Sequence, residues 1–132
     1  MTKDGIVASP RIEHVNVTVT DPERVAALMI DLFGWRIRWQ GPARDGGRAI
    51  HVGSADHYVA LYTGDRDHYG PEDFAKGRPL NHIGIVVDDL ETVEQRVAAA
   101  GLLPFAHADY EPGRRFYFLD YDGIEYEVVA YS

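Results

Sequence analysis

The feature that most constrains this chain is an internal repeat. Residues 13–25 read EHVNVTVTDPERV, and residues 81–93 read NHIGIVVDDLETV. The matching positions lie at one constant shift of 68 residues, which pairs His14 with His82, Asp21 with Asp89, Glu23 with Glu91 and Val25 with Val93. A solenoid needs at least three stacked repeats, so two copies indicate a chain built from two larger modules.

Each copy carries the same succession of secondary-structure signals. A strand-like run rich in β-branched residues comes first, and an aspartate able to cap a helix follows it. Apolar residues at helical spacing come next; Pro22 suits the first helical turn, and Gly34 and Gly101 suit the helix ends. Three further strand-like runs complete each copy. The expected strands are 12–19, 35–39, 48–52 and 58–62 in the first copy and 80–87, 103–107, 115–119 and 124–130 in the second, with helices at 22–33 and 90–100.

The pattern is therefore β-α-β-β-β twice, which predicts one domain of the α+β class. The first module covers about residues 11–64, and the second covers about residues 80–131. The stretch 65–79, rich in Asp, Gly and Pro, joins them. We expect its acidic part, 65–73, to be a solvated linker or a lid over a site.

Composition narrows the function. The chain has 132 residues, 45% of them apolar, which is enough for one domain with a core. Its net charge of -8 argues against binding nucleic acid, because phosphates need a basic face. Without cysteine there are no disulfides, thiolate ligands or cysteine nucleophiles, so any metal must be held by His, Asp or Glu. No segment has the pattern of a signal peptide or a membrane span, and we expect a cytoplasmic protein with no membrane partner.

Two βαβββ modules, a histidine opening the first strand of each, and the closing run DYDGIEYEVV resemble the vicinal oxygen chelate superfamily. The resemblance covers about residues 11–131. Members include glyoxalase I, extradiol ring-cleaving dioxygenases, fosfomycin-resistance enzymes, methylmalonyl-CoA epimerase and bleomycin-binding proteins. It implies that the modules form a curled, half-barrel-like mixed sheet around a central cavity that holds a metal. It leaves the reaction open, because one fold hosts many chemistries.

The resemblance implies three metal ligands. Family members place one on the first strand of each module, which here are His14 and His82, and another on the last strand after an Asp-Gly turn. Asp122-Gly123 is that turn, and Glu127 follows it. The alternatives are ordinary strand histidines that hydrogen-bond in the core or at the surface, and a Glu127 that faces solvent beside Glu125. The repeat relation between the two histidines favours the ligand interpretation of both.

A fourth ligand, present in members such as glyoxalase I, is missing. The repeat places its position near Ala60, which cannot coordinate a metal. Two imidazoles and one carboxylate suit Fe, Mn, Co, Ni or Zn and leave about three octahedral positions open. This is the ligand set of extradiol dioxygenases and fosfomycin enzymes. We expect one divalent metal ion per site, Fe2+ before Mn2+, Zn2+, Ni2+ or Co2+, and a small-molecule substrate that binds through two adjacent oxygens.

Two residues are candidates for catalytic roles. The run around Tyr117 resembles a pattern of the extradiol dioxygenases. In that pattern a histidine is followed by a tyrosine, an Asp-Pro-x-Gly turn and the ligand glutamate. Here Tyr121 replaces the proline, and His107 lies one residue further from Tyr117 than the pattern has it. The resemblance implies that Tyr117 hydrogen-bonds an oxygen at the metal and that His107 moves protons near neutral pH. The alternatives are strand packing for Tyr117 and a surface position for His107.

Candidate substrate-binding residues come from a turn and from strand faces. Arg115, with Arg114 before it, follows a turn signal and is able to clamp an anionic group, unless both arginines are solvated charges. Asn16 shares a strand face with His14, and Tyr62 shares one with Ala60, so both are expected to line the cavity. Trp35 and Trp39 suit core, dimer or substrate contacts alike, and no role is assigned to His51, His57 and His68.

Three functions remain open. The first is a metal-dependent enzyme, most like an extradiol dioxygenase. The second is a metal-free module that binds a drug, like the bleomycin-resistance proteins, which lack the triad; the presence of the triad here argues against it. The third is another metal reaction of the glyoxalase kind, such as epimerisation or opening of an epoxide by a thiol or water. The resemblance also implies a homodimer, with ligands from one chain or from two.

Overall fold

The first module folds, in a computed structural model of the chain, as β3 (His14–Thr18), α1 (Pro22–Phe33), β4 (Arg36–Pro42), β5 (Arg48–Gly53) and β6 (Tyr58–Thr63). The four strands form a mixed sheet in the order β3-β6-β5-β4, in which β3 and β6 run parallel and the other neighbours antiparallel. The structure describes residues 10–43, 46–64, 79–110 and 113–131, and the backbone of a short antiparallel pair, β1 (Thr2–Lys3) and β2 (Ile6–Val7).

The second module repeats this layout as β7 (Ile83–Val86), α2 (Leu90–Ala99), β8 (Phe105–Tyr110), β9 (Gly113–Leu119) and β10 (Glu125–Ala130). Its sheet has the order β7-β10-β9-β8, again with the first and last strands of the module parallel. The predicted α+β class with two βαβββ modules is thus confirmed. Strand β7 is shorter than the expected 80–87 because its ladder with β10 extends only from Ile83 to Val86.

The linker and the N-terminal residues were not predicted in the form that the structure shows, or are not described by it. The predicted linker 65–79 lies, except for Pro79, outside the described residues. The β1–β2 pair was not expected from the sequence. No helix in the described part of the chain is long and apolar enough to cross a membrane.

Matching aspartates begin the two helices. Asp21 caps α1 by accepting a hydrogen bond from the Arg24 amide at 3.2 Å, and Asp89 caps α2 by accepting from the Thr92 amide at 3.0 Å and from its hydroxyl at 2.8 Å. Gly34 ends α1 with φ 70°, a left-handed conformation that favours glycine. The sequence predicts these boundaries because each cap lies within one turn of the helix end it satisfies.

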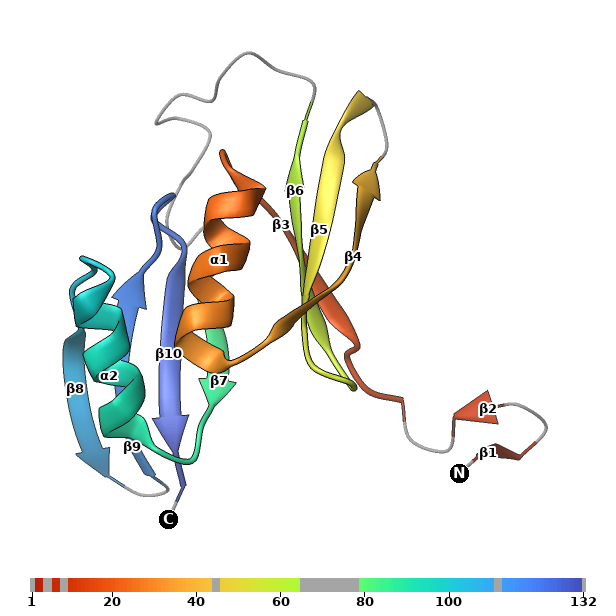
Figure 1. Cartoon of the computed structure of the whole chain (residues 1–132). Helices are drawn as coiled ribbons and strands as arrows, with labels where there is room; N and C mark the ends of the chain where they lie inside the picture. Colours follow the sequence, from red (N-terminus) through yellow and green to blue (C-terminus); the bar gives the residue numbers. More distant parts are fainter. Residues whose placement is uncertain are drawn as a thin grey trace.

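One face of each sheet is covered by a helix, and the other is open. Helix α1 contacts β5 and β6, α2 contacts β9 and β10, and the two helices contact each other. Figure 1 shows α1 between the two sheets and α2 against the second sheet. Alternate strand residues point toward the helices and share one core, which includes Val17, Val59, Leu61, Phe116, Phe118, Tyr126 and Val128. The residues between them, among them His14 and Glu127, therefore lie on the open faces.

A side chain from the second module ties it to the first. Asp122 accepts hydrogen bonds from the Thr20 amide at 3.1 Å and from the Thr20 hydroxyl at 2.8 Å. Thr20 lies in the bend between β3 and α1, and Asp122 belongs to the turn before β10. The turn that leads to Glu127 is thus held by both modules.

The repeat extends to an ion pair between helix and sheet in each module. Glu23 on α1 pairs with Arg48 on β5, and Glu91 on α2 pairs with Arg114 on β9. The hydrogen bond from Arg48 lowers the pKa of Glu23, and that from Arg114 lowers the pKa of Glu91. Both modules therefore hold their helix to the third strand by the same charge arrangement.

Replacing Arg48 with methionine is expected to lower the free energy of unfolding by no more than about 1 kcal/mol, because both partners of its ion pair are largely exposed. Urea denaturation of the wild-type and Arg48→Met proteins measures the difference, and high salt should shrink it. The double variant Arg48→Met, Glu23→Gln should have the same free energy of unfolding as Arg48→Met alone. A much larger loss that is insensitive to salt would contradict a surface role for the pair.

Candidate functional site

His82 and Glu127 meet on the open face of the second module. His82 directly precedes β7, and Glu127 lies in β10, the strand beside it. The Nε2 atom of His82 lies 3.0 Å from Oε1 of Glu127, and their side chains are 32% and 13% exposed. Pairing of the first and last strands of the module thus brings two of the three expected ligands together.

The 3.0 Å separation is that of a hydrogen bond, and it is also compatible with two ligands of one metal ion. Imidazole nitrogens and carboxylate oxygens bind such metals at about 2.0–2.2 Å, so two donors at a roughly right angle lie about 3 Å apart. The Nδ1 atom of His82 is 2.7 Å from Oδ1 of Asn81, so Nε2 is the ring nitrogen that faces Glu127. A metal-binding imidazole is usually oriented by a hydrogen bond from its other ring nitrogen to an oxygen atom. The donor set therefore fits a divalent metal at this position.

Arg115 holds the second oxygen of Glu127. Its Nη1 donates to Glu127 Oε2 at 2.8 Å, and its side chain is only 12% exposed. The guanidinium also lies over the ring of Tyr110, 4.7 Å from the centroid. Arg115 was expected to clamp a substrate anion, whereas the structure pairs it with a carboxylate of its own chain. The pair orients Glu127 so that Oε1 faces His82.

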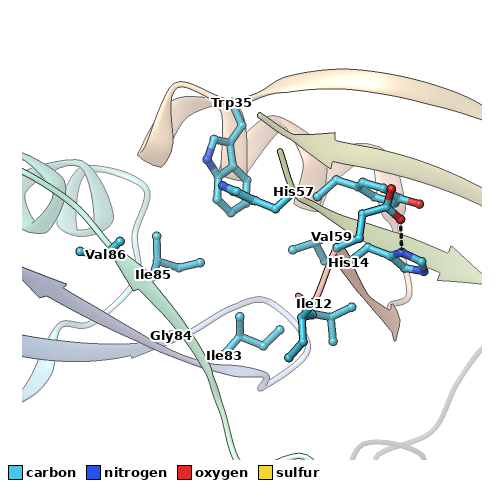
Figure 2. Close-up of a pocket in the computed structure, with 12 residues that line it drawn as sticks. Ile12, His14, Trp35, His57, Val59, Ile83, Gly84, Ile85 and Val86 are labelled. Atoms are coloured by element: carbon cyan, nitrogen blue, oxygen red, sulfur yellow. Dashed lines mark hydrogen bonds and ion pairs between the residues drawn. The ribbon is translucent and has the colours of Figure 1, made fainter. Parts of the chain in front are cut away.

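His14 lies on the other sheet, although it is oriented in the same way as His82. Its Nδ1 donates to Oε1 of the preceding residue, Glu13, at 2.9 Å, and its ring stacks on Tyr58 with centroids 4.7 Å apart. Figure 2 shows His14 on one side of a pocket of about 290 Å³, with β7 residues Ile83 and Ile85 on the other. In the part of the chain that the structure describes, no three His, Cys, Asp or Glu side chains form a group able to hold a metal. The three expected ligands therefore do not form one site within a single chain.

Tyr117 faces the His82–Glu127 pair. It lies opposite Glu127 in the register of β9 and β10, and its ring meets that of His82 edge to face, with centroids 5.8 Å apart. Burial, together with the nearby charge of Glu127, raises the pKa of Tyr117. The hydroxyl is therefore protonated at neutral pH and able to donate a hydrogen bond.

A β-bulge in β8 changes which of its side chains reach this face. Phe105 pairs with Tyr117, whereas Ala108 pairs with Arg115, so β8 carries one residue more than β9 over the same length. Ala106, inside the bulge, has a φ of 55°. The bulge takes up the extra residue that the sequence shows between the histidine and tyrosine positions.

His107 is turned to the helix side of the sheet by this bulge. Its Nε2 lies 2.7 Å from Oε2 of Glu94 on α2, and its ring stacks against that of Phe116, with centroids 5.9 Å apart. Phe116 faces the core, whereas Tyr117 faces the open side. The structure thus does not bring His107 to the Glu127 site, and its expected proton-transfer role there loses its geometric basis.

The sheet register makes Ala60 the counterpart of Glu127. Asn16 lies opposite Ala60 in module one, and Gly84, which is equivalent to Asn16 by the repeat, lies opposite Glu127 in module two. Module one therefore presents a methyl group where module two presents a carboxylate, as the sequence indicates.

Asn16 and Tyr62 line a cavity on the open face of module one. Its volume is about 590 Å³, and Trp39 and His51 line it as well. Burial is the largest cause that lowers the pKa of His51, so its imidazole is neutral at neutral pH. Asn16 and Tyr62 thus come together, whereas Arg115 belongs to the other module's face.

Sequence reasoning missed two residues near these sites. Oε2 of Glu125 lies 3.9 Å from Nδ1 of His82, and the Glu125 side chain is only 11% exposed. The alternation that puts Glu125 and Glu127 on one face was the available signal for the first. His51 is the second, and its position in a predicted strand was the only hint. Of the other unassigned residues, Trp35 contacts Phe33 and His57, and His68 lies outside the described residues.

Comparisons with known proteins agree with this fold. A family model described as Glyoxalase/Bleomycin resistance protein/Dioxygenase superfamily matches residues 11–128. A search of curated proteins finds no match.

Solved structures share the fold at low sequence identity. A glyoxylase/bleomycin resistance protein/dioxygenase domain from Frankia sp. EAN1pec is 22% identical, with a TM-score of 0.81 over 95% of this chain and 100% of that chain. The fosfomycin resistance protein FosX from Listeria monocytogenes is 17% identical, with a TM-score of 0.73 over 96% of each chain. FosX from Mesorhizobium loti is 22% identical, with a TM-score of 0.67 over 94% of this chain and 92% of that chain. A further structure of the Listeria protein is a complex with Mn(II) and a sulfate ion.

Proposed function

This chain belongs to the Glyoxalase/Bleomycin resistance protein/Dioxygenase superfamily, and on that premise we propose that it is a metal-dependent enzyme acting on a small substrate with two adjacent oxygens. The observation that carries the proposal is the 3.0 Å approach of His82 Nε2 to Glu127 Oε1. The complex of the Listeria FosX with Mn(II) supports a divalent metal in this fold. The proposed ligands are His14, His82 and Glu127.

We place His14 of a second copy beside the His82–Glu127 pair. Within one chain, the two open faces belong to sheets on either side of α1 (Figure 1). A twofold dimer in which the open face of module one covers that of module two of the partner would complete two equivalent sites. Glu13 and Asn81 support Nε2 as the metal-binding atom of the two histidines, because each accepts a hydrogen bond from the Nδ1 of its histidine.

A dioxygenase-like reaction of the extradiol type is the one we favour. Ala60 in place of a fourth ligand leaves about three octahedral positions for substrate and for dioxygen or water. A bound divalent metal, Fe2+ for this reaction, would supply a Lewis acid that holds the two substrate oxygens. Tyr117 would donate a hydrogen bond to one of those oxygens, and Arg115 would keep the Glu127 carboxylate in place. His107 has no part in this proposal, because the bulge turns it toward α2.

Opening of an epoxide is the second candidate. It is favoured by a structure of a Listeria FosX variant, a complex with Mn(II) and 1S,2S-dihydroxypropylphosphonic acid, which carries two adjacent hydroxyl groups. Such a reaction needs a water or thiol nucleophile and no dioxygen. Mn2+ would then be the metal, held by the same three ligands.

Metal analysis followed by a ring-cleavage assay tests the proposal. Elemental analysis should find about one divalent ion per chain after loading. Anaerobic loading with Fe2+ and exposure to catechols in air should give a ring-cleavage chromophore that Mn2+- or Zn2+-loaded protein does not give. One metal per chain without the chromophore would select another metal reaction. Protein that takes up no metal yet binds a drug-like ligand tightly would overturn the proposal in favour of a metal-free binding module.

A further inference from the structure

A row of aromatic side chains crosses the open face of module one. His14 in β3, Tyr58 in β6, His51 in β5 and Trp39 in β4 follow the order of the strands in the sheet. Neighbouring ring centroids lie 4.7, 4.4 and 4.9 Å apart along this row, which are separations of favourable ring contacts. The row ends at Trp39, which is 47% exposed and has no strand beyond it in the sheet order.

The cavity of about 590 Å³ opens where the row ends. Trp39 and Tyr62 contribute its aromatic walls, and Asn16 and His51 contribute groups able to form hydrogen bonds. The described residues that line this cavity include no Lys, Arg, Asp or Glu. The Arg38 guanidinium lies outside this lining, over the Tyr58 ring of the same face, 4.6 Å from its centroid. The walls themselves are therefore aromatic and polar, which suits stacking of a flat ring.

Glycines make room for both aromatic walls. A Cβ atom at Gly41 would lie 2.9 Å from Cζ2 of Trp39, and one at Gly47 would lie 2.7 Å from Cε1 of Tyr62. Without those side chains, the Trp39 ring lies close to the backbone of Gly41 in its own strand, and the Tyr62 ring lies close to the backbone of Gly47 before β5. A side chain at either glycine would displace one of the aromatic walls of the cavity.

Trp39 stands well away from the proposed metal ligand on the same face. Three strand-to-strand steps of about 4.8 Å separate β3 from β4, so Trp39 lies about 14 Å from His14 across the sheet. A group that stacks on Trp39 is therefore a different part of the substrate from the two oxygens at the metal.

We propose that this cavity binds an aromatic ring of the substrate, stacked on Trp39, beyond the group that carries the adjacent oxygens. The inference rests on the proposed function, because it names the substrate class of that site. It separates this chain from an enzyme for small phosphonates, which have no ring to stack on Trp39. The substrate is accordingly an aromatic molecule larger than a single chelating group.

Nuclear magnetic resonance of the metal-free protein tests the ring subsite separately from the metal site. The chain has two tryptophans, and a Trp35→Phe variant assigns the two indole N–H signals. Titration with 2-naphthol should shift the Trp39 signal and leave the Trp35 signal in place. Trp39→Ala should weaken 2-naphthol binding by about tenfold, measured by calorimetry, whereas Trp35→Phe, the matched control, should not. Circular dichroism establishes that both variants are folded.

Two further probes separate stacking from other kinds of binding. Decahydro-2-naphthol, which keeps the hydroxyl group but has no aromatic ring, should bind about tenfold more weakly than 2-naphthol. Propylphosphonate should leave the Trp39 signal unmoved. The proposal is overturned by an unchanged Kd in Trp39→Ala, by equal binding of the saturated analogue, or by a phosphonate that binds as tightly. Metal titration of the same protein is scored independently, so loss of the metal site and loss of the ring subsite give different results.

Discussion

Replacing Glu127 with alanine is expected to weaken divalent metal binding by more than about 100-fold. Loss of a group that merely orients a ligand costs about 10- to 100-fold in affinity, so loss of a ligand should cost more. Calorimetric titration with Mn2+, which does not oxidise readily, measures the affinity. Glu94→Ala is the matched control, because Glu94 lies in the same module but pairs with His107 on the helix side. His14→Ala and His82→Ala should lose affinity as Glu127→Ala does; full affinity in all three would refute the site.

Mixing the variants decides whether the ligands come from one chain or two. In a shared site, a dimer of one His14→Ala chain and one Glu127→Ala chain has one intact site and one doubly altered site. Refolding these variants together should restore about one quarter of the wild-type metal stoichiometry, since half of the randomly paired dimers carry one intact site. A mixture of His82→Ala and Glu127→Ala should restore none, because both residues serve the same site from the same chain. If metal binding recovers in neither mixture, the shared site is contradicted.

Replacing Asp120 with asparagine is expected to remove a pH dependence of stability. Asp120 is buried, and its Oδ1 accepts hydrogen bonds from the amides of Asp122 and Ile124, both at 2.9 Å. Its Oδ2 has no hydrogen-bond partner among the described residues. Burial raises the pKa of Asp120 from 3.8 to about 6, so the folded state binds this proton more tightly than the unfolded state. The resulting stabilisation is fully present below about pH 4 and is lost as the pH rises through about 6.

A pKa shift of about two units corresponds to a change of roughly 3 kcal/mol in the free energy of unfolding between low and neutral pH. Urea denaturation of metal-free protein at several pH values should show that Asp120→Asn gains about that much relative to wild type between about pH 4 and pH 7. Asp120→Ala should instead be less stable than Asp120→Asn throughout, because it leaves the two turn amides without their acceptor. A difference between Asp120→Asn and wild type that does not vary with pH would show that Asp120 ionises normally in the folded protein.

Local signals were enough to predict most of the elements. Asp21, Pro22 and Gly34 lie within a turn of the helix ends that they satisfy, so their effect does not depend on distant contacts. Alternation likewise predicted that Glu125 and Glu127 share a face, because side chains in any strand alternate. The repeat placed the missing fourth ligand near Ala60, and the strand register of the two modules makes Ala60 the counterpart of Glu127.

His107 shows where local reasoning fails. Its distance from Tyr117 in the sequence differs from the dioxygenase pattern by one residue, and one residue is enough to exchange the faces of a strand. The bulge at Ala106 absorbs that residue and directs His107 to Glu94. A bulge depends on how two strands pair, which the sequence of one strand does not reveal.

The sequence by itself determined which residues are equivalent. The shift that relates His14 to His82 is a property of the chain order, and so are the helix caps and the absence of a carboxylate at Ala60. Only the tertiary structure decided which of these residues meet. Pairing of the first and last strands of a module brings His82 to Glu127, whereas helix packing between the two sheets leaves His14 on a separate open face. The physical reason is that each sheet buries its apolar face against a helix, so its polar face is left to be completed by another surface.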